Sequence, residues 1–120
     1  MAQPLVWTAD GKLDAAGSAV FTAAGVADVE LGPVPPSLVW LITRMVVNTT
    51  GSSSSTCSVY DGAPVPANLI DATGTGQQDA SDFGQPWLLR TGETVLFRWE
   101  GGAPGETATA RLVGLTQVVS

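Results

Sequence analysis

The chain has 120 residues, of which 44% are apolar and 13% are charged, and its formal net charge is −6. This length suits one domain with a single core, and five Lys and Arg residues are too few to neutralise a nucleic-acid backbone, which argues against DNA or RNA binding. Because about a quarter of the residues in an ordinary globular domain are charged, we expect a partner to cover part of this surface.

The sequence also lacks the residues on which most enzyme chemistry depends. It contains no histidine, which excludes the commonest general base, the Ser-His-Asp triad and nearly every transition-metal site. Its one cysteine, Cys57, cannot form an internal disulfide, and no apolar run has the length of a membrane span. We therefore expect a protein that is not an enzyme, has no cofactor, is made in a reducing cytoplasm and is not inserted in a membrane.

Residues 1–17 show no sustained period and include one proline and two glycines. They are predicted to form an extended N-terminal arm ahead of a β-sandwich domain that spans residues 18–120. The apolar triplet in this arm either folds back onto the domain's own sheet or docks on another subunit, with its tryptophan as the anchor. The candidate docking residues are Leu5, Val6 and Trp7.

The next part of the chain predicts three strands, at residues 18–24, 26–31 and 38–48, with a proline-rich connector at 32–36 that cannot join a ladder. The third strand is apolar on both faces, so one face needs a second cover, either the arm or a neighbouring copy of the chain. Arg44, set among apolar residues, is expected to reach an edge or to pair with a carboxylate. The expected self-association face of this strand comprises Val39, Leu41, Met45 and Val47.

Five further strands are predicted at residues 56–60, 68–71, 86–90, 93–100 and 106–114. A serine-rich loop at 49–55 and a connection at 72–84, rich in Gly, Asp and Gln, are expected to point outward. In the strand 93–100, Val95, Phe97 and Trp99 share one face, which must be core. Eight strands in roughly a hundred residues favour an all-β fold, an antiparallel two-sheet sandwich like the jelly roll, over the seven-stranded immunoglobulin sandwich.

One acidic cluster is a candidate metal site. Asp79 and Asp82 could supply oxygen ligands to calcium, but they lack the spacing of an EF-hand loop. The alternative is that both carboxylates bond to turn amides. The cluster is therefore a weak calcium candidate, and no metal is expected.

The C-terminal half carries several turn and core motifs. They are Asn68-Leu69-Ile70-Asp71, Asp79-x-x-Asp82, Gln85-Pro86, Gly92-Glu93, Trp99-x-Gly101 and Pro104-Gly105-x-x-Ala108. Together these motifs, from Asn68 to Leu115, resemble a group of small virion proteins of tailed bacteriophages that infect actinobacteria. The lysine-poor composition, rich in Ala, Gly and Val, is also what a GC-rich host would give.

This resemblance implies a structural component of the virion: a capsid decoration (minor capsid) protein that binds the outer capsid surface and stabilises the shell across capsomers. The partners it implies are the major capsid protein and copies of this chain, as a trimer or another small homo-oligomer. The alternative is a tail or fibre jelly roll that binds host-surface glycans, which an exposed Trp87 or Tyr60 would favour because sugars stack on aromatic planes.

Overall fold

The computed structural model describes the backbone of residues 6–50, 55–72 and 78–118, and the side chains of residues 11–50, 55–71 and 80–118. Its elements are β1 (Val6–Val20), β2 (Val26–Leu31), β3 (Leu38–Thr49), β4 (Thr56–Asp61), a short 3-10 turn η1 (Pro66–Asn68), β5 (Leu69–Ala72), β6 (Gln78–Leu89), β7 (Val95–Glu100) and β8 (Thr107–Val118). The prediction of eight strands is confirmed.

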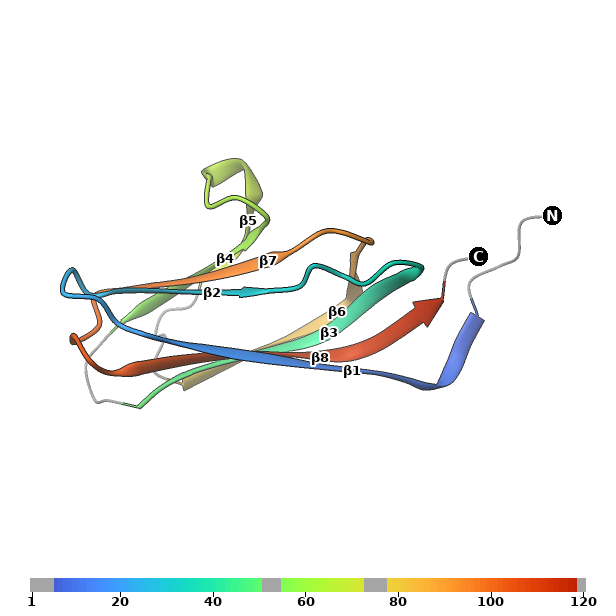
Figure 1. Ribbon diagram of the computed structural model, residues 1–120, viewed down its shortest axis with the longest axis horizontal. Coiled ribbons are helices and arrows are strands. Elements are labelled where there is room, and N and C mark those ends of the chain that lie inside the picture. The colour runs from blue at the N-terminus through green and yellow to red at the C-terminus, as the bar shows by residue number, and fades with distance from the viewer. Residues whose placement is uncertain (1–5, 51–54, 73–77, 119–120) are drawn as a thin grey trace.

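The strands form two four-stranded antiparallel sheets stacked face to face (Figure 1), with the orders β1-β8-β3-β6 and β2-β7-β4-β5. We call them sheet A and sheet B. Four of the pairings join the first half of the chain to the second in reverse order: β1 with β8, β2 with β7, β3 with β6 and β4 with β5. The pairings β3 with β8 and β4 with β7 then roll this long hairpin into two layers, which is the topology of a jelly roll.

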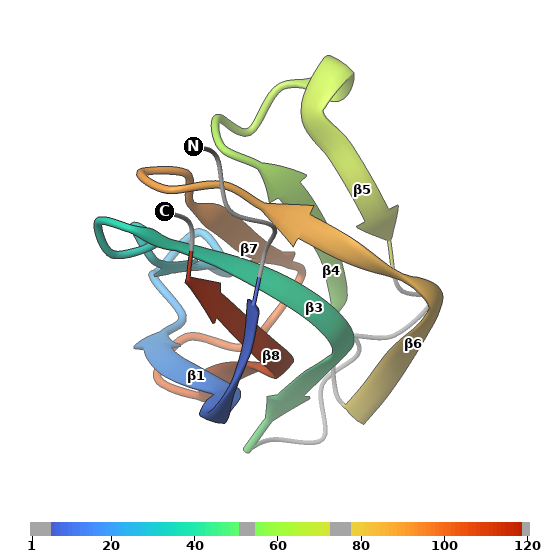
Figure 2. The same cartoon turned by 90° about the vertical axis from the view of Figure 1, so that its right-hand side faces the viewer.

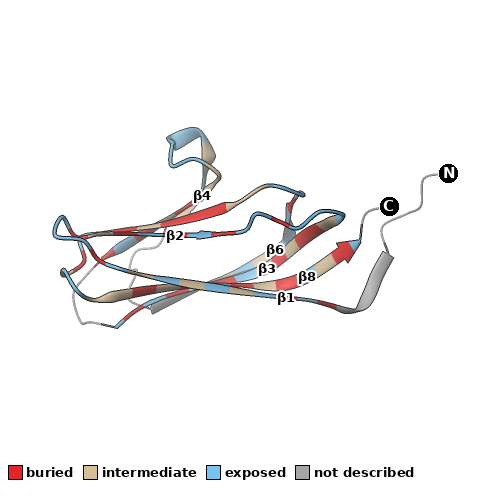
Figure 3. Ribbon diagram, viewed as in Figure 1, coloured by how far each residue is buried: buried red, intermediate tan, exposed pale blue. Residues whose placement is uncertain are grey.

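The core lies between the sheets, and buried residues alternate with more exposed ones along β2, β4 and β8 (Figure 3). Val95, Phe97 and Trp99 on β7 are each 0% exposed, which confirms the predicted core face, and the Phe97 and Trp99 rings stack with centroids 6.2 Å apart. Large aromatics bury the most apolar area per residue, so β7 is the centre of the fold's hydrophobic stabilisation.

The predicted boundary of the N-terminal arm is wrong. Residues from Val6 onward belong to β1, which pairs with β8 from Val6 to Val20 with a register shift between Trp7 and Lys12. The shift interrupts the period of two, and the strand beyond Asp14 consists of small residues, so the apolar signal of a strand is weak there. The proposed arm is therefore reduced to the residues before Val6, which lie outside the described part of the chain.

The predicted connection at 72–84 is also shorter than expected, because β6 begins at Gln78. Opposite Thr43 of β3, four residues of β6 form a bulge without register partners: Phe83, Gly84, Gln85 and Pro86. A proline can occupy this strand because β6 is the edge of its sheet, where one side of the backbone has no ladder to maintain. The start of β6, rich in Gln, Asp and Gly, has the composition of a loop although its backbone is extended.

Candidate interaction surfaces

The bulge at Thr43 decides which side of β3 faces the core. The register of β3 against β8 shifts between Ile42 and Arg44, and the Thr43 hydroxyl donates a hydrogen bond to the Val113 carbonyl at 3.2 Å. An extra residue in a strand reverses the faces of everything that follows it. Trp40 and Ile42 therefore face the core before the bulge, and after it the odd-numbered residues of β3 face the core instead.

This reversal corrects the predicted self-association face. Met45 and Val47 are 2% and 3% exposed and belong to the core cluster, so they are not available to a partner. Leu41 lies before the bulge, on the opposite side from Ile42, and is half-buried, whereas Val39 is 8% exposed. The four residues do not form one face, because a strict period of two was assumed across an irregular strand.

The outer face of sheet A carries a short apolar row that the sequence did not single out. Leu41 is in register with Leu115 of β8 on one side and with Leu88 of β6 on the other. Leu115 and Leu88 are 39% and 37% exposed. These three side chains, which we call the leucine row, cross three adjacent strands on the solvent side of the sheet.

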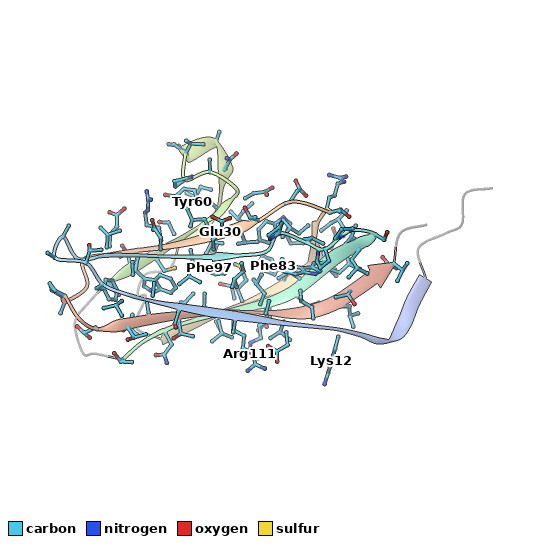
Figure 4. The ribbon with its side chains drawn as sticks, viewed as in Figure 1. Lys12, Glu30, Tyr60, Phe83, Phe97 and Arg111 are labelled. Carbon is cyan, nitrogen blue, oxygen red and sulfur yellow. The ribbon has the colours of Figure 1, made fainter. Side chains whose placement is uncertain are left out.

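Two ion pairs lie elsewhere on this face. The Arg111 guanidinium donates two hydrogen bonds of 2.7 Å to the two carboxylate oxygens of Asp14, and this contact lowers the pKa of the Asp14 carboxyl below its ordinary value. Figure 4 shows the Arg111 and Lys12 side chains projecting from the β1–β8 side of the sandwich, away from Phe97 in the core. Arg44 Nε lies 3.6 Å from Asp82 Oδ1, which confirms the predicted carboxylate partner of Arg44.

A cross-strand ion pair also lies on the outer face of sheet B. The Arg98 guanidinium donates hydrogen bonds of 2.8 and 2.9 Å to the two oxygens of Asp28 on the neighbouring strand. Tyr60 is in register with Leu96, which is 8% exposed although it alternates with the core residues of β7. Both outer faces therefore carry cross-strand ion pairs, whose individual contributions to stability are small because the pairs are at least partly exposed.

An apolar, charge-free projection rises from sheet B between β4 and β5 (Figure 1). It comprises residues 62–70, and it has no Asp, Glu, Lys or Arg. Val65, Leu69 and Ile70 are 44%, 46% and 39% exposed. We call this segment the β4–β5 projection.

Internal hydrogen bonds shape the β4–β5 projection. The Asn68 backbone N–H donates to the Val65 carbonyl at 2.9 Å, and the Asn68 side-chain amide donates to the Ala63 carbonyl at 3.1 Å. Two prolines, Pro64 and Pro66, fix further backbone angles. The projection thus presents apolar side chains from a segment that is already ordered, which lowers the entropic cost of binding.

The candidate docking residues fall at the start of β1. Leu5 lies outside the described residues, and of Val6 and Trp7 only the backbone is described, in register with Val118 and Gln117 of β8. Val118 is 41% exposed. The docking role of this triplet stays a prediction, with Val118 as its described neighbour.

The acidic cluster can be described only in part. Asp82 is engaged with Arg44, and the Asp79 side chain lies outside the described residues, although its backbone is in register with Val47. Asp71 instead accepts a hydrogen bond of 2.6 Å from the Ser81 hydroxyl, which joins β5 to β6. Among the described residues, no group of three or more His, Cys, Asp or Glu side chains could hold a metal ion.

The sequence predicts a turn and a short strand for the β4–β5 projection and gives no distinctive signal of an exposed apolar surface. The nine residues between Asp61 and Asp71 carry no charge, but the chain contains longer uncharged runs, such as residues 45–60. The leucine row had no sequence signal either, because it depends on the register of three strands. No helix in the described part of the chain has the length and apolar character to cross a membrane.

Comparison with known proteins gives a fold and no family. No protein-family model matches the sequence, and no curated protein matches it. Among solved structures, the chain is similar to a chain in the acidic stable capsid structure of Helicobacter pylori bacteriophage KHP30, with a TM-score of 0.63 and 13% sequence identity over 96% of this chain and 93% of that one. At this identity the likeness shows a shared fold.

A second solved structure, a hypothetical protein from Leishmania major, has a TM-score of 0.24 at 11% identity and covers 92% of this chain and 75% of its own. A TM-score this low carries no argument about fold or function.

Proposed function

We propose that this protein is a structural component of a phage virion, and specifically a decoration protein that binds the outside of the head and has no catalytic role. The observation that carries the proposal is the shared fold with a chain of a phage capsid structure, which extends over nearly the whole of both chains. The low proportion of charged residues and the absence of histidine support a binding role without chemistry.

The physical basis of decoration is selective binding to the assembled shell. A protein that binds a site spanning two capsomers stabilises the shell, because that site exists only when the capsomers are together. A repeating lattice also offers many identical sites, so modest affinities add up over the particle. The major capsid protein is then the partner, and the outer capsid surface is the location.

The β4–β5 projection is the surface best suited to contact such a shell. It is exposed and free of charge, so burying it against a partner removes apolar side chains from water without desolvating a charged group. The start of β1, with Leu5, Val6 and Trp7, is the other proposed docking surface. An exposed valine with a described side chain lies in the projection, Val65, and another lies beside the start of β1, Val118 of β8, which allows a matched comparison.

The test is co-sedimentation of the purified protein with empty phage heads that lack it. Val65→Asp places a charge on the β4–β5 projection, and Val118→Asp places the same charge beside Val6 at the start of β1; the two valines are 44% and 41% exposed. We expect the wild type and Val118→Asp to sediment with heads and Val65→Asp to remain in the supernatant. The reverse pattern would assign docking to the start of β1.

Failure of the wild type to bind heads at all would refute decoration. The protein should then be tested for host-surface glycans, because a glycan-binding module of a tail or fibre shares this fold class. The aromatic surface for that role is limited: Trp87 and Tyr60 are both half-buried, and the Trp87 ring packs against Phe83 with centroids 6.3 Å apart.

A further inference from the structure

The two sheets have four edge strands, and three of them are protected from pairing with another chain. β5 has four residues, and β2 has six, of which Asp28 and Glu30 are exposed acids. β6 has twelve residues but is interrupted by the bulge that contains Pro86. Short length, charge, bulges and proline are the means by which proteins keep edge strands from associating.

The fourth edge, β1, lacks this protection over most of its length (Figure 2). From Lys12 to Val20, nine consecutive residues pair with β8 without a register shift. Within the described part of the chain, no other strand pairs with β1, so the backbone groups on its outer side have no ladder partner. An unpaired edge of this length is a template for a further strand.

The side chains of β1 favour close approach of a second strand. Residues 15–19 are Ala, Ala, Gly, Ser and Ala, so no large side chain shields the edge. Within the segment from Lys12 to Val20, the two charged residues, Lys12 and Asp14, lie at one end, and Asp14 is already paired with Arg111. The protein as a whole has a net charge of −6, and this edge is one place where two copies can meet without bringing unpaired carboxylates together.

We propose that β1 pairs antiparallel with β1 of a second copy of this chain, which joins the two A sheets into one continuous sheet of eight strands. The register that uses the whole segment from Lys12 to Val20 has its two-fold axis at Ala16. It places Lys12 opposite Val20 of the second copy, and Asp14 opposite Ser18 of the second copy. No like charges face each other, and each contact occurs twice because the interface is symmetric.

In this register, a positive and a negative charge placed at Ser18 should have opposite effects on the strength of the dimer. Ser18 is exposed, and in its own chain it is paired with the uncharged Thr109. Ser18→Lys would face Asp14 of the second copy and strengthen the dimer, whereas Ser18→Asp would face the same carboxylate and weaken it. We expect the dimer dissociation constant to change by roughly fivefold in each direction.

Asn48 provides the matched control. Asn48 of β3 and Ser18 of β1 are both in register with Thr109 of β8, so Asn48 lies in the same row of sheet A, two strands away from β1, and it is also exposed. Asn48→Lys and Asn48→Asp therefore place the same charges on the same face but away from β1. If the dimer formed by stacking the outer faces of sheet A, the Asn48 and Ser18 variants would act alike.

The experiment is sedimentation equilibrium of the full chain and these four variants at low salt. The proposal predicts a wild-type dimer, tighter for Ser18→Lys, weaker for Ser18→Asp and unchanged for both Asn48 variants. A wild-type protein that stays monomeric at about 1 mM would overturn it, and so would equal effects at the two positions. Because no heads are present, this result is independent of whether the protein decorates a capsid.

Discussion

Gly114 of β8 lies opposite the bulge of β3 and has no room for a side chain. A Cβ atom built on Gly114 would overlap the Leu41 carbonyl oxygen and lie 3.0 Å from the Ile42 Cα. These are backbone atoms of a central strand, hydrogen-bonded on both sides, so no rotamer change relieves the overlap. We therefore expect Gly114→Ala to destabilise the fold by about 3 kcal/mol, the upper part of the range for overpacking.

For a domain of this size, such a loss corresponds to a fall in Tm of about 10–15 °C. The assay is thermal or urea unfolding followed by circular dichroism, with Gly84→Ala as the control. Gly84 lies in the bulge of β6, where an added Cβ meets no atom within 4 Å, so this variant should stay within about 0.5 kcal/mol of wild type. Equal stabilities of the two variants would refute the proposed packing of the bulge.

Two further predictions concern a core contact and a surface ion pair. Gly102→Ala is expected to destabilise the fold because its Cβ would overlap the Phe21 ring. Since the obstacle here is a side chain, adding Phe21→Leu should recover part of the lost stability, and unfolding of the single and double variants measures this recovery. In NMR titration, the Asp14 carboxyl should have a pKa below its ordinary value, and Arg111→Gln should raise it. Because the folded pKa is depressed, the stability that this pair contributes is present above the unfolded pKa and is lost as the pH falls through the folded one; an unchanged Asp14 titration in Arg111→Gln would contradict the pairing.

The part of the fold that could be predicted from the sequence is the part where large side chains alternate. Val95, Phe97 and Trp99 have no other way to be buried than on one face of a strand, and the turns around them fix its ends. β1 and β6 were harder, because edge strands bury fewer side chains and both contain irregularities. Small residues in β1, and Gly, Asp and Gln in the first half of β6, gave these strands the composition of an arm and a loop.

The candidate surfaces show a similar division. Arg44 was correctly expected to find a carboxylate, because an arginine among apolar residues has few other solutions. The face containing Met45 and Val47 was wrong because one extra residue, Thr43, reverses the strand, and a bulge of this kind leaves no mark in the sequence of β3 itself. Gly114 on the neighbouring strand is the residue that the bulge requires, but a glycine there indicates a bulge only when the register of the two strands is known.

The central claim is that this sandwich binds an assembled phage shell and stabilises it. The most direct measurement is the melting temperature of empty heads by scanning calorimetry, with and without saturating protein. The account predicts that the shell transition rises on addition of the protein and that unassembled capsid subunits show no such shift, because the binding site requires neighbouring capsomers. An unchanged shell transition at saturating protein would contradict the account.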